Sequence, residues 1–168
     1  EDELRQITSQ WSKGIAADNP SQRLTLCAES YLLSVRQIRN TPDRTRRREL
    51  RQKATHSLIT ALGYEYSRSS LPTALDGETL VPLLSRATNE DGRDVVWILE
   101  APLEGPEDEA SDPLGASFER EQFLEPDQEH AETGRAIEEI LGDGIFDLRN
   151  GPRHVLVLGL SQIILVDR

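Results

Sequence analysis

Glu100 is the residue of this chain whose setting points most directly to chemistry, because it ends an apolar, strand-like run over residues 95–99. The run follows Asp91-Gly92, a pair typical of turns. A carboxylate at the end of a strand can bind a divalent metal ion, and a lysine two residues later can steady the attacking water. Pro102 occupies that later position. The pattern therefore predicts a working hydrolytic site, an inactive copy of one, or an ordinary buried strand.

Metal-dependent hydrolysis of this kind needs a second carboxylate beside Glu100. Asp76 and Asp91 precede it at suitable spacing, but each stands before a glycine, where aspartate is common for backbone reasons alone. We treat Glu100, Asp91 and Asp76 as vestigial positions and predict no catalytic residue, metal site or cofactor in the chain. Mg²⁺ is the expected cofactor if the site is active, and Lys53 is then the candidate substitute for the missing lysine, since the chain has no lysine besides Lys13 and Lys53.

A cluster of arginines is the second feature with chemical meaning. Residues 36–53 contain eight basic residues against Asp43 and Glu49, although the chain as a whole has a net charge of −11. Phosphate binding requires clustered positive charge of this sort. The predicted DNA contacts are Arg44, Arg46, Arg47, Arg48 and Arg51. The alternatives are a solvated helix face, or a patch that docks on the protein's own acidic segment or on a neighbouring domain.

Residues 1–63 are predicted to be helical, because apolar side chains recur at helical spacing in three stretches. A break at Pro20 separates the first stretch from the second. Thr41 is expected to cap the third helix, with Pro42 at its first position and Gly63 at its end. This helix carries the arginines in its N-terminal half.

Residues 64–168 change to strand-like patterns, with strands expected at 80–85 and 94–100 and a hairpin over 154–166. A helix is expected to start at Thr133. The acidic segment, residues 102–132, is predicted to run over the surface. Its expected anchors are Leu114, Phe118, Phe123 and Leu124. The order of elements predicts an α/β (α+β) fold in which N-terminal helices pack on a mixed β-sheet.

Composition restricts the class of protein further. Cys27 is the one cysteine, which excludes an internal disulfide and a cysteine-based zinc site and suits a reducing cytoplasm. No apolar run approaches the roughly 20 residues of a membrane span. The acidic start Glu1-Asp2-Glu3 has no basic region, so we expect no signal peptide. The chain contains no methionine and closes on a strand-like segment. We therefore expect a cytoplasmic domain cut from a longer protein, with no membrane partner.

Several segments resemble the N-terminal region of large bacterial DNA methylases, namely the type IIG restriction–modification proteins and related phage-defence, adenine-specific enzymes. The similar segments are residues 61–64, 96–101, 137–148 and 152–168. The resemblance implies a restriction-endonuclease-like sheet in which Glu100 takes the glutamate position and residues 154–166 form the following hairpin. Pro102 in place of lysine, and Leu160-Ser161-Gln162 where the family often has Asn-Gly, imply that this sheet is degenerate.

The resemblance also implies a function. The chain is expected to be an accessory, catalytically inactive nuclease-like domain that supports DNA engagement or docks on downstream domains of the same chain. S-adenosylmethionine would belong to the inferred downstream methyltransferase. An active Mg²⁺-dependent DNA endonuclease domain is one alternative, and a protein-interaction module that uses the acidic segment is another.

Overall fold

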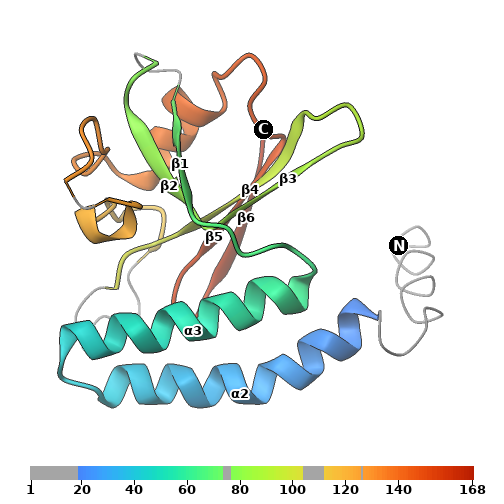
Figure 1. Cartoon of the computed structure of the whole chain (residues 1–168), viewed down its shortest axis with the longest axis vertical. Helices are drawn as coiled ribbons and strands as arrows, with labels where there is room; N and C mark the ends of the chain where they lie inside the picture. The colour runs from blue at the N-terminus through green and yellow to red at the C-terminus, as the bar shows by residue number, and fades with distance from the viewer. Residues whose placement is uncertain (1–18, 74–76, 104–111, 126) are drawn as a thin grey trace. The chain divides into compact units, whose positions relative to one another are not determined.

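The computed structural model describes residues 19–73, 77–103, 112–125 and 127–168. The chain divides into two compact units, residues 1–65 and residues 66–168, close to the boundary predicted after residue 63. Helices make up the described part of the first unit, while the second combines two small sheets with short helical segments (Figure 1). The predicted α+β class is confirmed.

The first unit is a helical hairpin of α2 (Pro20–Asn40) and α3 (Arg44–Leu62), which lie side by side (Figure 1). Asn19 starts α2, since its side-chain oxygen accepts a hydrogen bond from the backbone N–H of Ser21 at 2.9 Å. Apolar side chains of both helices are buried, with Ile38 at 1% and Ile59 at 0% exposure. No helix in the described ranges is long and apolar enough to cross a membrane.

The start of α3 differs from the sequence prediction. Its N-cap is Asp43, whose carboxylate accepts a hydrogen bond from the Arg46 N–H at 2.6 Å. Thr41 instead closes α2, where its hydroxyl donates to the Gln37 carbonyl at 2.7 Å. Because α2 continues to Asn40, the short connection leaves Asp43 at the cap position, where its charge also suits the helix dipole. The predicted end at Gly63 is confirmed by its left-handed φ of 94°.

The second unit contains a two-stranded and a four-stranded sheet. The strands are β1 (Ser69–Pro72) and β2 (Leu80–Leu83) in the first, and β3 (Ser85–Thr88), β4 (Asp94–Glu100), β5 (His154–Leu158) and β6 (Ile163–Asp167) in the second. The order of the larger sheet is β3-β4-β5-β6, and it is mixed, since β4 pairs with β5 in parallel and the other neighbours are antiparallel.

The strand predicted over residues 80–85 is divided at Leu84. The backbone N–H of Leu84 donates to the Ile98 carbonyl at 2.9 Å, while the Leu84 carbonyl accepts from Ser67 at 2.9 Å. The chain thus passes from the smaller sheet to the larger one at this residue. The helix expected from Thr133 is also shorter than predicted. It starts after Ala136 as α4 (Ile137–Glu139) and continues as the π-helical turn η2 (Ile140–Ile145).

One face of the four-stranded sheet carries the hydrophobic core of the second unit. Trp97 and Leu99 of β4 lie beside Val155 and Val157 of β5 on this face. The residues that cover it are Phe118, Phe123, Ile137, Ile140, Leu141 and Ile145. The expected anchors Phe118 and Phe123 are therefore confirmed, and Leu114 packs at the border of the cluster. Leu124 is 63% exposed and anchors nothing.

The burial of Phe118 predicts a matched pair of stability effects. We expect Phe118→Ala to lower the free energy of unfolding by about 3–5 kcal/mol, because it leaves a cavity in the core. Leu124→Ala, six residues along the same segment, should change it by less than about 0.5 kcal/mol. Urea unfolding followed by circular dichroism measures both. An effect of Phe118→Ala as small as that expected for Leu124→Ala would contradict the role of Phe118 in this core.

Candidate functional site

Glu100 is the last residue of β4, where that strand runs beside β5 and pairs with Leu158. It is half-buried. The backbone carbonyl of Glu100 accepts a hydrogen bond from the side-chain NH₂ group of Gln122 at 2.6 Å. The side-chain oxygen of Gln122 accepts a hydrogen bond from the backbone N–H of Glu119 at 2.8 Å. The 3₁₀ turn η1 (Arg120–Gln122) is thereby fixed to the end of β4. This part of the candidate site is a structural junction.

Asp91 lies at the opposite end of β4 from Glu100. It is exposed in the turn before the strand, where its N–H donates to the Asn89 side chain at 3.1 Å. Because a strand rises about 3.3 Å per residue, the strand between the two carboxylates spans roughly 20 Å. Glu100 and Asp91 therefore cannot be two ligands of one ion. Asp76 lies outside the described residues.

The described part of the second unit contains no lysine. Pro102 follows the strand, Lys53 is exposed on α3, and Lys13 lies outside the described residues. Within the described ranges, no three histidine, cysteine, aspartate or glutamate side chains lie close enough together to hold a metal ion. Cys27 is half-buried, and this burial raises the pKa of its thiol, which makes it a weaker nucleophile.

The predicted DNA-binding arginines lie on the first turns of α3 but differ in exposure. Arg44 and Arg46 are exposed, and Arg46 forms an ion pair with Glu49 at 2.7 Å. Arg47 and Arg48 are half-buried. Arg51 is 4% exposed, a burial that does not suit a phosphate contact. Spacing explains this burial, because Arg51 precedes Ala54 and Leu58 by three and seven residues and so shares their inward face.

The hairpin adds two arginines that were not among the predicted contacts. Arg36 and Arg39 lie in the last turns of α2, and only residues 41–43 connect that helix to α3. Antiparallel packing therefore places them near the start of α3. We call this group the basic end of the hairpin. Its members are Arg36, Arg39, Arg44, Arg46 and Arg48. The number of basic residues in 36–53 can be counted in the sequence. That residues of both helices lie at one end of the hairpin follows only from the short connection between α2 and α3.

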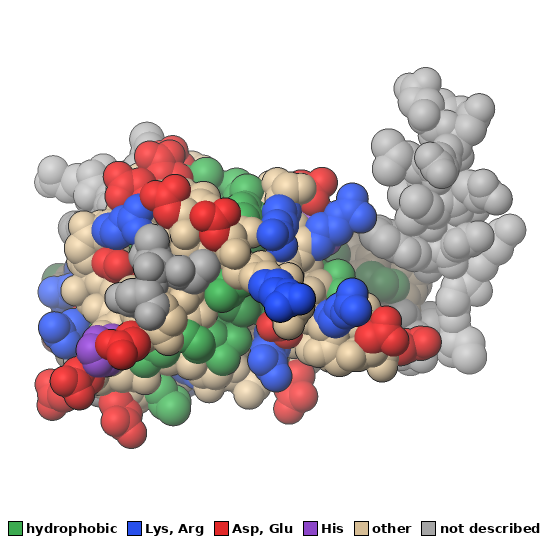
Figure 2. Space-filling model, turned by 90° about the horizontal axis from the view of Figure 1, so that it is seen from above, with side chains coloured by type: hydrophobic (Ala, Val, Ile, Leu, Met, Phe, Trp, Pro, Cys, Tyr) green, Lys and Arg blue, Asp and Glu red, His purple; other side chains and the backbone are tan. Residues whose placement is uncertain are grey.

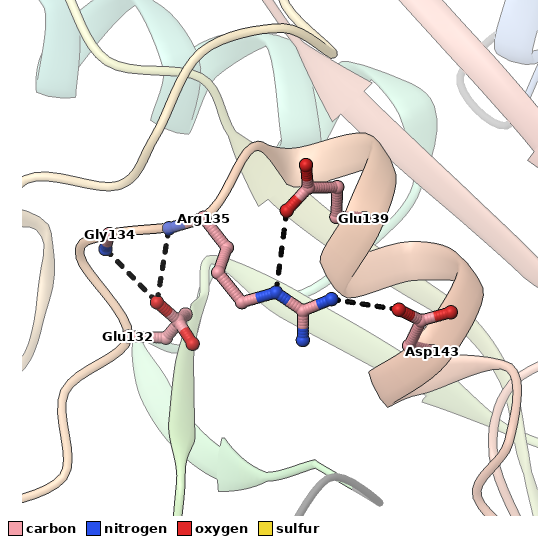
Figure 3. Close-up of polar contacts among 5 residues, drawn as sticks. All are labelled: Glu132, Gly134, Arg135, Glu139 and Asp143. Atoms are coloured by element: carbon pink, nitrogen blue, oxygen red, sulfur yellow. Dashed lines mark hydrogen bonds and ion pairs between the residues drawn. The ribbon is translucent and has the colours of Figure 1, made fainter.

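Arg135 lies at the centre of a polar cluster in the second unit (Figure 3). Its guanidinium contacts Asp143 at 2.8 Å and Glu139 at 3.4 Å, and the hydrogen bond to Asp143 is the main cause that raises the pKa of Arg135. Glu132 accepts hydrogen bonds from the N–H groups of Gly134 and Arg135 at 3.0 and 3.2 Å. The cluster fixes the loop before α4 to the following turns, which is a structural role.

Charge is unevenly distributed along the sequence. Figure 2 shows acidic and basic side chains next to one another on the face that it presents, with some hydrophobic side chains exposed. A chain with a net charge of −11 can still present local positive potential where basic residues cluster, as they do within residues 36–53.

Comparison of the chain with models of protein families, with curated proteins and with solved structures gave no match in any of the three.

The bridging amide of Gln122 generates a prediction about the end of β4. We expect Gln122→Ala to lower the free energy of unfolding by about 1–3 kcal/mol, because it leaves two backbone groups without their hydrogen-bond partner. Arg120→Ala, at an exposed position of the same turn, is the control and should have little effect. Denaturant unfolding measures the difference, and a neutral Gln122→Ala would refute the bridging role.

Proposed function

We propose that this chain is a catalytically inactive, nuclease-like accessory module of a DNA restriction–modification or phage-defence methylase. Its role is to engage DNA through the basic end of the α2–α3 hairpin. The observation that carries the DNA contact is the concentration of positive charge there, in a chain that is otherwise acidic. Residues 36–53 have a net charge of +6, from eight basic and two acidic residues, against −11 for the whole chain.

The exposed arginines fit phosphate better than base edges. Arg44 and Arg46 leave one helix turn in different directions, and Arg36 extends from the neighbouring helix. The positive charge is therefore spread over a surface, and no single side chain is set to read a base edge. The N-terminus of α3 lies at the same place, and its helix dipole favours an anion nearby. The expected interaction is therefore independent of DNA sequence and sensitive to salt.

The end of β4 supports the inactive form of the module. Glu100 has its carbonyl bound to Gln122, and Asp91 lies at the far end of the strand. Pro102 offers no positive charge to an attacking water. S-adenosylmethionine is not assigned to any of these residues, since methyl transfer belongs to the inferred downstream domain.

DNA binding through the basic end predicts a specific salt dependence. For a duplex of arbitrary sequence, the slope of log K against log salt should fall in magnitude by about 0.9 for each lost phosphate contact. The triple substitution Arg44→Gln, Arg46→Gln, Arg48→Gln should therefore reduce it by about 2.7. Fluorescence anisotropy at several salt concentrations measures the slope.

A matched control separates local contact from net charge. The triple Arg93→Gln, Arg120→Gln, Arg153→Gln removes the same charge at exposed positions of the second unit and should leave the slope nearly unchanged. Equal losses in both triples would show that only the total charge matters, and unchanged binding in the α3 triple would remove the basic end from the proposal.

Catalytic inactivity is tested by incubating supercoiled plasmid with the chain and Mg²⁺ or Mn²⁺. We expect no nicking above background, because Asp91 lies at the far end of β4 from Glu100 and Pro102 stands where a lysine would be needed. Nicking by the wild-type chain that Glu100→Ala abolishes would establish the alternative, an active metal-dependent endonuclease. Nicking that survives Glu100→Ala would indicate a contaminating nuclease and would be removed by further purification before the comparison is repeated.

A further inference from the structure

The two borders of the four-stranded sheet differ in their capacity to accept another strand. The border strand β3 is four residues long, its pairing with β4 has an irregularity between Ala87 and Thr88, and it carries the charged Arg86. Bulges, short length and charge are the devices that protect sheet edges. The opposite border strand β6 has a regular register with β5 throughout Ile163–Asp167 and carries a charge only at its last residue, Asp167.

Hydrogen bonds at both ends of the β5–β6 ladder define which backbone groups of β6 point outward. Gly159 N–H donates to the Gln162 carbonyl at 2.9 Å, and Arg168 N–H donates to the Arg153 carbonyl at 3.0 Å. Because directly bonded pairs alternate along an antiparallel ladder, the even-numbered residues of β6 bond to β5. The N–H and C=O groups of Ile163, Leu165 and Asp167 therefore point away from β5, and no described strand pairs with them.

The side chains at these positions suit burial. Ile163 is 52% exposed and Leu165 is 62% exposed. No charged residue interrupts β6 before Asp167. An apolar edge with unpaired backbone groups is the arrangement that accepts a further strand.

We propose that β6 pairs with β6 of a second copy of this chain, antiparallel, about a two-fold axis at Leu165. In this register Leu165 faces Leu165 of the other copy, and Ile163 faces Asp167 of the other copy. Since the outward residues are spaced symmetrically about Leu165, every outward N–H and C=O of both strands finds a partner. Two hydrogen bonds for each of three such pairs give about six across the interface.

Charge and closure favour this self-pairing over other registers and over growth. Sliding one strand by two residues places Leu165 opposite Asp167 of the other copy, and sliding it by four in the same direction places Asp167 opposite Asp167, which is unfavourable. Sliding it by two the other way leaves Asp167 outside the ladder. The protected β3 border cannot receive β6, so a head-to-tail chain of sheets does not form. An isologous contact between identical strands closes at two copies.

Sedimentation of the 168-residue chain over a wide range of concentration tests the association. We expect a reversible monomer–dimer equilibrium in the wild type. Leu165→Lys should abolish it, because it places two ammonium groups at the two-fold axis. The matched control Thr88→Lys, which adds the same charge at the opposite border, should leave it intact. A wild-type chain that sediments as a monomer at every concentration overturns the proposal, and so does dimerisation that survives Leu165→Lys.

Disulfide cross-linking tests the register without depending on the fold of the lysine variant. In a Cys27→Ser background, Leu165→Cys should form a covalent dimer under mild oxidation, because paired Cα atoms lie about 5.5 Å apart. Ile163→Cys should not, since the two Ile163 positions would be about 13 Å apart. Absence of the Leu165→Cys dimer, or equal cross-linking of both variants, would contradict the two-fold axis at Leu165.

Discussion

The parallel pairing of β4 with β5 is the constraint on which the rest of the second unit depends. Adjacent parallel strands cannot be joined by a tight turn, so the chain must leave β4 at Ala101 and return over a face of the sheet before it enters β5. That return contributes Phe118 and Phe123 from the acidic segment and Ile137 and Ile140 from the helical turns. The polar, proline-bearing segment is therefore fixed at points along its length by the side of the sheet that it must cross.

Much of this fold was predictable from local pattern. The run that ends at Glu100 gave β4 with its bounds, and the apolar hairpin near the end of the chain gave β5 and β6, because uninterrupted apolar residues report burial directly. The division between β2 and β3 was not predictable, since it depends on the hydrogen bond from Leu84 to Ile98 across the sheet. The cap of α3 was misplaced for a similar reason, because Thr41 and Asp43 compete and the length of α2 decides between them.

The candidate site was less predictable, because residue type can be read from a sequence and distance cannot. Asp91 has a suitable chemical group at a suitable sequence spacing from Glu100. Because the residues between them form an extended strand, that spacing becomes a large distance between the two carboxylates. The burial of Arg51, in contrast, could have been predicted from the sequence. Its helical spacing from Ala54 and Leu58 already placed it on the inward face of α3.

Pro102 belongs both to the candidate site and to the end of strand β4. The last ladder bond between β4 and β5 runs from Ala101 N–H to the Leu158 carbonyl at 3.0 Å. Pro102 has no N–H to donate on the opposite side of the strand, because neighbouring residues of a strand point their N–H groups to alternate sides. Pro102 thus stands at the point where β4 has ended and the chain enters the acidic segment. Gln122 then returns to bind the Glu100 carbonyl. The end of β4 is therefore part of the junction that orders the crossover, and Asp91 at the other end of the strand is too far away to complete a metal site with Glu100.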